Sequence, residues 1–150
     1  MKNKGAGKFV KELYDKFNDT GIERIAHYAD LKGYTVVDKE EDYKVDIIAH
    51  KGGKERRVEV EMLNKKFTCA KDFEYDNVSF LGRKEKFAKD GAFWYILLSH
   101  HSDHFIACYS SFIYQEKYKK EIFINSPYRK GMDTFYRVPK EYCYFIDMSN

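Results

Sequence analysis

Hydrophobic and polar residues alternate along residues 44–62 in two runs that flank a Gly-Gly pair. A glycine pair between such runs is a strong hairpin signal, because two-residue hairpin turns need backbone conformations that glycine adopts easily. The pattern therefore predicts an antiparallel hairpin whose register follows by counting outward from Gly52-Gly53. The expected pairs are Lys51 with Lys54, Ile48 with Arg57, Asp46 with Glu59, and Lys44 with Glu61.

Side chains of a strand alternate between two faces, so this hairpin has an acidic face and an apolar face. Asp46, Glu59 and Glu61 share the acidic face. Opposed like charges destabilise a sheet unless a cation lies between them, and Mg²⁺ takes carboxylate oxygens as ligands. Two interpretations stay open: a divalent-metal site, or a solvated face on which nearby lysines and arginines neutralise the acids. The predicted apolar face consists of Val45, Ile47, Ala49, Val58, Val60 and Met62.

Helical periodicity precedes the hairpin and strand-like runs follow it. Residues 8–18 and 21–31 have apolar positions at helical spacing, with an interruption at Asp19-Thr20-Gly21, and we expect two helices there. The order of elements predicts one α+β domain over residues 1–150, with a mixed sheet flanked by helices. The other expected elements are a strand at 34–37, an acidic turn at 38–42, a loop at 68–77, a helix at 82–89, a buried strand at 92–99, a strand at 105–109 and C-terminal strands.

The composition is that of a folded domain with a mild positive charge. Charged residues make up 34% of the chain and aromatic residues 17%, and the net charge of +3 permits a polyanionic partner without requiring one. Three cysteines, far apart and odd in number, indicate reduced thiols and a cytoplasmic protein. We expect no signal peptide and no membrane span, because no apolar run is long enough.

The hairpin resembles the motif of the PD-(D/E)XK nuclease superfamily, which includes restriction-endonuclease-like and Holliday-junction-resolvase-like enzymes. The family pattern is an Asp on one strand, a hairpin, and (Asp/Glu)-x-Lys on the next strand. Here the pattern is Asp46, then Glu59-Val60-Glu61, with Val45 in place of the motif proline and Glu61 in place of the usual lysine. The resemblance covers residues 20–110 and implies an αβββαβ core, here with an extra N-terminal helix and C-terminal strands.

The resemblance implies a metal-dependent endonuclease that hydrolyses phosphodiester bonds in DNA. Asp46, Glu59 and the backbone carbonyl of Val60 would hold Mg²⁺, for which Mn²⁺ can substitute. Glu61 would orient or deprotonate the attacking water, or bind a second metal ion. A homodimer, or a partner protein that confers specificity, is expected by family analogy alone.

Glu23 and Lys44 have two interpretations each. Glu23, in the second predicted helix, either reaches the metal site, as a helical Glu does in resolvase-like members, or forms a capping box with Thr20. Lys44 either supplies the cation that the motif lacks or forms a plain cross-strand ion pair with Glu61.

Basic residues after the hairpin are candidates for phosphate contacts. Lys65 and Lys66 follow the acidic strand directly, and either could replace the motif lysine. Arg83, Lys84 and Lys86 make the predicted helix at 82–89 the most basic element of the chain. These side chains would hold phosphates of the nucleic acid near the active site, or they form an ordinary solvated helix face.

Further interpretations remain for the function of the chain and for two of its segments. The chain is a nuclease-fold protein without catalysis that serves as a DNA-binding or protein-interaction module, which Glu61 favours, or the hairpin acids decorate an unrelated α+β domain. The His-His-x-x-His cluster at 100–104 is interpreted as a polar turn, because three ligands on a tight turn rarely close a zinc site. Interleaved aromatic and basic residues in the C-terminal part would contact nucleic acid or, more ordinarily, pack in the core.

Overall fold

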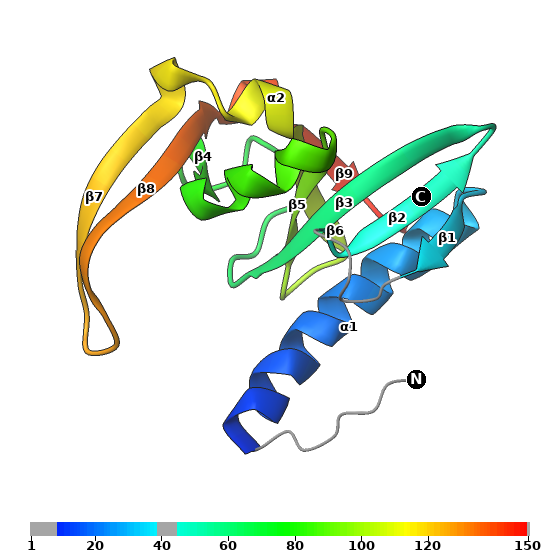
Figure 1. The fold of residues 1–150 in the computed structure, drawn as a ribbon, viewed down its shortest axis with the longest axis horizontal. Coiled ribbons are helices and arrows are strands. Elements are labelled where there is room, and N and C mark those ends of the chain that lie inside the picture. Colours follow the sequence, from blue (N-terminus) through cyan, green and yellow to red (C-terminus); the bar gives the residue numbers. More distant parts are fainter. Residues whose placement is uncertain (1–8, 39–44, 150) are drawn as a thin grey trace.

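The computed structural model describes residues 9–38 and 45–149 and has a mixed α+β architecture built on two sheets (Figure 1). The larger sheet has the strand order β1-β2-β3-β5-β6-β9 and the smaller one β4-β8-β7. The predicted α+β class with a mixed sheet is confirmed. The elements are α1 (Phe9–Leu31), β1 (Thr35–Asp38), β2 (Ile47–Lys51), β3 (Lys54–Leu63), β4 (Asn77–Leu81), η1 (Gly82–Asp90, a 3₁₀ helix), β5 (Trp94–Ser99), β6 (His104–Tyr109), α2 (Ser110–Ile113), η2 (Glu116–Tyr118), β7 (Lys119–Asn125), β8 (Lys130–Pro139), η3 (Lys140–Tyr142) and β9 (Tyr144–Asp147).

The β2–β3 hairpin forms with the predicted register. Its ladder runs from the pair Lys51–Lys54 to the pair Ile47–Val58. Both residues of the Gly52-Gly53 turn have positive φ, 59° and 78°, as a two-residue turn between twisted strands requires. On its other side β3 pairs in parallel with β5, so β3 lies inside the sheet.

The chain bends at residues 45–46, directly before β2. Asp46 therefore stands just outside the ladder and remains next to β3. The bend also moves Val45 to the opposite core from Ile47, so the prediction that Val45 belongs to the same apolar face is wrong. Lys44 and most of the predicted acidic turn at 38–42 lie outside the described residues.

Both faces of the larger sheet are buried. One face packs against α1 through a core that includes Ile25, Ile47 and Ile96. The other face packs against the smaller sheet, with Phe80 and Val138 fully buried between them. The site described below lies where these two layers meet, at the part of β3 that β2 does not pair with.

The N-terminal region is one helix instead of the two predicted ones. α1 continues through the expected interruption at Asp19-Thr20-Gly21, and Thr20 is not at a helix start, so the capping box with Glu23 does not form. Gly21 is buried against β3, where an added Cβ would lie 2.7 Å from the Sδ of Met62. Glycine thus lets the helix approach the strand closely, which outweighs its low helix propensity.

The smaller sheet was not expected from the sequence. β4 has only two buried apolar side chains, Val78 and Phe80, which is too short a pattern to distinguish a strand from the start of the following helix. The predicted helix at 82–89 is present as the 3₁₀ helix η1. None of the helices in the described part of the chain is long and apolar enough to cross a membrane. Cys69, Cys108 and Cys143 are free thiols.

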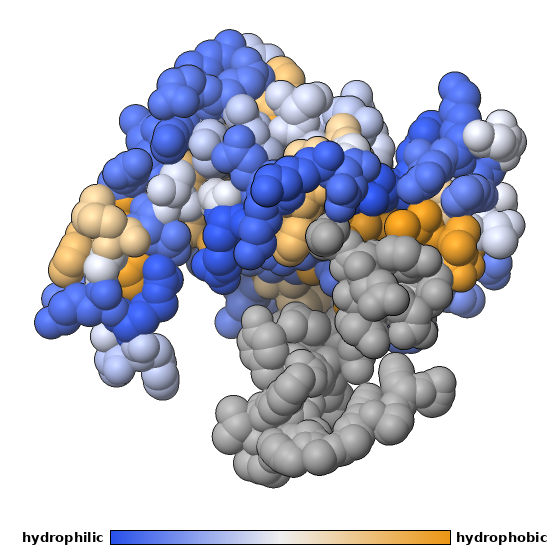
Figure 2. Space-filling model, viewed as in Figure 1, coloured by the Kyte–Doolittle hydropathy of each residue, from blue (hydrophilic) through white to orange (hydrophobic). Residues whose placement is uncertain are grey.

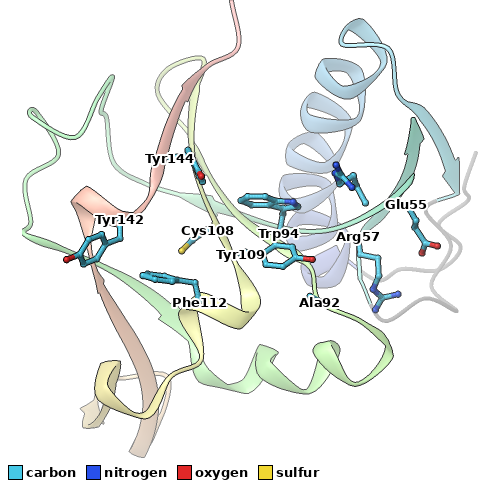
Figure 3. A pocket seen from close by; sticks show the side chains of 10 residues that line it. Glu55, Arg57, Ala92, Trp94, Cys108, Tyr109, Phe112, Tyr142 and Tyr144 are labelled. Carbon is cyan, nitrogen blue, oxygen red and sulfur yellow. The ribbon is translucent and has the colours of Figure 1, made fainter. Parts of the chain in front are cut away.

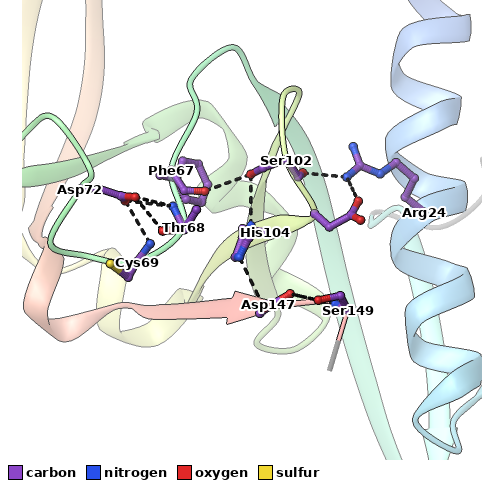
Figure 4. A network of polar contacts seen from close by, with 10 residues as sticks. Arg24, Phe67, Thr68, Cys69, Asp72, Ser102, His104, Asp147 and Ser149 are labelled. Atoms are coloured by element: carbon purple, nitrogen blue, oxygen red, sulfur yellow. Dashed lines mark hydrogen bonds and ion pairs between the residues drawn. The ribbon is translucent and has the colours of Figure 1, made fainter.

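The turn between β5 and β6 is tied to α1 and β9 by polar contacts (Figure 4). Arg24 of α1 donates to the carbonyl of Ser102 at 2.9 Å and contacts the carboxylate of Asp103 at 3.2 Å. His104 lies 3.2 Å from the Ser102 hydroxyl and 3.6 Å from the carboxylate of Asp147. The histidine-rich segment is the polar turn that the sequence predicts, and its polar contacts hold α1 and β9 against this turn.

Candidate active site

Three acidic and two basic side chains line one small cavity of about 140 Å³ beside the open side of β3. The β2 ladder ends at the pair Ile47–Val58, so within the described parts of the chain no strand pairs with residues 59–63 of β3 on that side, and the cavity lies there. We call this space the carboxylate cavity. Its lining residues are Ile22, Asp46, Glu59, Val60, Glu61, Leu81, Arg83 and Lys84.

Asp46 and Glu59 form the inner end of the carboxylate cavity. The backbone N–H of Val60 donates to Oδ2 of Asp46 at 2.8 Å and fixes that carboxylate against β3. Glu59 is only 5% exposed, in contrast to most glutamates, which are solvated. The fold therefore places two carboxylates side by side in a partly dehydrated site.

Burial and mutual repulsion disturb the titration of this pair. Burial and, after it, the neighbouring charge of Asp46 raise the pKa of Glu59 to about 7, while Lys84 opposes the change. The pKa of Asp46 is also raised, chiefly by burial, although the hydrogen bond from Val60 and the charge of Lys84 lower it. A strongly perturbed acidic pair in a cavity is a typical feature of functional sites.

Lys84 of η1 provides the cation closest to the acidic pair. Its Nζ donates to Oε2 of Glu59 at 2.5 Å, and only 18% of its side chain is exposed. The contact joins residues 25 positions apart, from two elements that the sequence does not show to be neighbours. The sequence suggested Lys65, Lys66 or Lys44 for the cation beside these acids, whereas the structure places Lys84 there.

Glu61 lines the same cavity and is held by a buried tyrosine. The hydroxyl of Tyr95, on the neighbouring strand β5, donates to Oε1 of Glu61 at 2.6 Å and accepts from the backbone N–H of Leu81 at 3.3 Å. One carboxylate oxygen of Glu61 is therefore fixed, and the other can accept from a water or another ligand. Sequence reasoning missed Tyr95, because it lies within an apolar run typical of a buried strand.

Val60 and Arg83 complete the wall. The N–H and C=O of one strand residue point to the same side, so the carbonyl of Val60 faces the side on which its N–H contacts Asp46. Arg83 lies at the rim and reaches the carboxylate of Asp133 on β8 at 3.8 Å. The carbonyl of Val60 and the guanidinium of Arg83 would thus both lie near a ligand bound in the carboxylate cavity.

The structure does not bring the other predicted site residues to this cavity. Glu23 is exposed and lines a separate groove with His27 and Asp30. Lys65 forms an ion pair with Glu74 at 3.1 Å. Lys66 and Lys86 are exposed, Lys86 near the ring of Phe87, and Lys44 lies outside the described residues.

The carboxylates of the cavity suit a metal ion that needs few protein ligands better than one that needs three or more. Among residues 9–38 and 45–149, no group of three or more His, Cys, Asp and Glu side chains is arranged to hold a metal. Mg²⁺, however, is commonly held by one or two carboxylates, with water and phosphate oxygens as the other ligands. Two adjacent, partly dehydrated carboxylates with raised pKa values meet that lesser demand.

A larger groove of about 550 Å³ lies elsewhere, at the end of the sheet where β5 begins (Figure 3). Its walls are mainly aromatic, including Trp94, Tyr109 and Tyr144, with Arg57 at one side. None of the three acids of the carboxylate cavity lines this groove. Its size therefore does not make it the better candidate for catalysis, since Glu55 is the one carboxylate among its lining residues and it holds no pair of acids.

No protein-family model, curated protein or solved structure matches this chain.

Proposed function

We propose that the chain is a metal-dependent nuclease with a restriction-endonuclease-like fold that hydrolyses phosphodiester bonds in DNA. The observation that carries the proposal is the pair of the half-buried Asp46 and the buried Glu59, with Lys84 beside it, in one cavity. The element order α1, β1, β2, β3, η1, β5 supports the αβββαβ core, with β4 inserted before η1.

The charges around the cavity support a divalent cation. Asp46, Glu59 and Glu61 bring three carboxylates, against which Lys84 brings one ammonium group. Arg83 is partly engaged by Asp133 outside the cavity. Like charges placed so closely are unfavourable without a counter-ion, and a hard divalent cation would supply the missing positive charge.

In the proposed reaction, water attacks the phosphorus atom and the bond from phosphorus to the leaving oxygen breaks. Asp46, Glu59 and the carbonyl of Val60 would hold Mg²⁺ or Mn²⁺, which when bound supplies Lewis-acid activation of the phosphate and a lower pKa for the attacking water. Glu61 accepts the water's proton through the oxygen that Tyr95 leaves free. Solvent water protonates the leaving oxygen.

Lys84 and Arg83 would stabilise the negative charge that develops on the phosphate. The ammonium group of Lys84 is held next to the acidic pair by Glu59 and so needs little reorganisation when the phosphate arrives. Arg83, at the rim, can offer two parallel N–H donors to phosphate oxygens. In this proposal Lys84 replaces the motif lysine, because Glu61, which occupies the motif position, cannot supply a positive charge.

The test is nicking of supercoiled DNA with Mg²⁺ or Mn²⁺, together with calorimetric titration of the metal. We expect Asp46→Asn to lose both metal binding and nicking, and Lys84→Met to keep metal binding but to lose nicking at least 100-fold. Lys65→Met and Glu74→Gln are matched controls, because they remove an exposed Lys–Glu ion pair outside the cavity. Nicking that survives in Asp46→Asn would contradict the proposal.

The alternative function is a DNA-binding or protein-interaction module that has lost catalysis. Two observations favour it: Glu61 stands in the place of the motif lysine, and Lys84 already neutralises Glu59 without a metal. The nicking assay, with DNA binding measured beside it, separates the two functions. Metal-independent DNA binding without nicking, on supercoiled, branched and single-stranded substrates alike, would support the module.

A further inference from the structure

The hairpin of β7 and β8 extends beyond the body of the protein as a two-stranded arm (Figure 1). We define the arm as residues 119–139. The two strands pair along their length from Lys119–Tyr136 to Asn125–Lys130, whereas β4 covers only residues 135–139 of β8. Among the described residues, no third strand thus pairs with the outer five pairs. A two-stranded ribbon in water is marginally stable, which suggests that a partner covers it in the functional state.

Large apolar side chains are exposed on this arm. Phe123 and Met132 are directly opposite each other and are 56% and 61% exposed, and Tyr128 at the tip is 93% exposed. The tip is ordered by hydrogen bonds between Ser126 and Arg129, among them a backbone bond of 3.0 Å. Figure 2 shows hydrophobic and hydrophilic residues mixed over this part of the molecule.

The arm also carries the net charge of the protein. Residues 119–139 contain five Lys or Arg and two Asp or Glu, a net charge of +3, which equals the net charge of the whole chain. Asp133, one of the two acids, is held by Arg129 at 2.8 Å. Lys120, Lys130 and Arg137 are exposed and form no ion pair with another described residue.

The arm is attached to the element that carries Lys84. Gly82, at the start of η1, lies against the backbone of Thr134 in β8. Tyr136 of β8 donates to Glu85 of η1 at 3.3 Å. Alternation along the strands places Phe123 and Met132 on the same face of the ribbon as Thr134 and Tyr136. The exposed apolar pair therefore continues the face that contacts η1.

From these observations we infer that the arm binds duplex DNA and holds it against the carboxylate cavity. Two-stranded ribbons fit into the major groove of DNA, lysines and arginines contact the phosphates, and apolar side chains such as Phe contact the methyl groups of thymine there. Five residue pairs span roughly 17 Å, enough to cross a major groove of about 12 Å. Duplex DNA as the partner rests on the nuclease function proposed above.

A second copy of the chain fits the arm less well. Two arms that pack together would bring two net charges of +3 into contact, whereas duplex DNA offers a dense row of negative charges. The aromatic and basic residues of this segment, ambiguous in the sequence, are therefore assigned to DNA contact where they are exposed and to the core where they are buried, as Tyr136 is.

The test is binding of a fluorescein-labelled 20-base-pair duplex in EDTA, measured by anisotropy at several salt concentrations with the full chain. We expect Phe123→Ser/Met132→Ser to weaken binding at least tenfold with an unchanged salt slope. Lys120→Gln/Lys130→Gln should weaken binding and reduce the slope of log K against log salt by about 1.8, since each phosphate that is no longer neutralised reduces it by about 0.9. The matched controls are Leu31→Ser and Lys54→Gln/Lys71→Gln, all at exposed positions, and each should bind as the wild type does.

Thermal melting of each variant checks that the fold is kept. Arm variants that bind as tightly as the controls would overturn the inference, as would a wild type that does not bind the duplex. A change from dimer to monomer in the arm variants, with unchanged DNA affinity, would assign the arm to a second copy and also overturn it. Because binding is measured without metal, a failure of cleavage alone would reject the nuclease and leave the arm's role standing.

Discussion

Glu59 combines burial, an acidic neighbour and a lysine, and each of these affects its protonation. In the folded protein the carboxyl group of Glu59 has a pKa of about 7, against an ordinary value of 4.5. Between these two pH values the folded state binds more protons than the unfolded state. The contribution of Glu59 to the free energy of unfolding therefore falls as pH rises through this range and reaches its lowest value above pH 7.

We predict that Glu59→Gln gains stability relative to the wild type as pH rises from 4.5 to 8. A shift of this size corresponds to up to about 3 kcal/mol of relative gain. Urea denaturation at both pH values, in EDTA, measures the change. The wild type has the charged pair of Glu59 with Lys84 only where Glu59 is ionised, and the effect of Lys84 is already included in the pKa of about 7, so the difference between the two pH values reports the net shift.

Glu74→Gln is the control for this measurement. Hydrogen bonds from Tyr75 and Lys65 lower the pKa of the exposed Glu74, so its pH effect has the opposite sign. A difference between Glu59→Gln and the wild type that stays constant from pH 4.5 to 8 would contradict the assignment of a raised pKa to Glu59.

The contacts of single residues also show what the sequence could reveal about the site. Asp46 and Glu59 were found because a two-glycine turn fixes their register within a few residues. The contact of Lys84 with Glu59 spans 25 residues and that of Tyr95 with Glu61 spans 34. Contacts between residues so far apart in the sequence depend on how η1 and β5 pack against β3, and no local pattern encodes that packing.

At the level of elements, η1 is the link between the carboxylate cavity and the arm. It carries Lys84 and Arg83, and its first residue, Gly82, touches β8. A Cβ at position 82 would lie 2.7 Å from the carbonyl oxygen of Thr134 and 3.0 Å from its Cβ. Because the clash involves backbone, it cannot be relieved by turning a flexible side chain, and η1 and β8 must move apart.

We predict that Gly82→Ala lowers the free energy of unfolding by about 1–3 kcal/mol, the usual cost of overpacking. We further expect at least a tenfold loss of nicking, since a shift of η1 displaces Lys84 from Glu59 and small displacements of reacting groups are costly. Lys86→Ala, at an exposed position of the same helix, should change neither quantity. Wild-type stability in Gly82→Ala would show that η1 and β8 are not in close contact.

The elements differ in how well the sequence predicted them. The β2–β3 hairpin and β5 have patterns long enough to be recognised from local spacing alone. The sequence predicts two helices in place of α1 because Gly21 resembles a break, whereas the packing of Gly21 against Met62 suits a continuous helix. The smaller sheet is formed by β4 and two strands more than thirty residues later, and such pairing has no local signal.

For the whole molecule, the proposed function links metal binding to global stability. A ligand that binds only the folded state raises the free energy of unfolding by an amount that depends on its concentration relative to Kd. In this chain the ligand would also relieve the repulsion between Asp46 and Glu59, which the folded protein bears without a metal. Thermal melting can therefore detect the metal site even when no cleavable substrate is known.

We predict that Mg²⁺ at 100 times its Kd raises the free energy of unfolding by about 2.7 kcal/mol at pH 8. The increase should shrink at pH 6, because Glu59 then holds a proton that competes with the metal. Asp46→Asn should abolish the effect, whereas Glu74→Gln should keep it, and NaCl at equal ionic strength separates binding from screening. An equal increase in Asp46→Asn would place the metal elsewhere, and the acidic pair would then be a structural ion cluster neutralised by Lys84 alone.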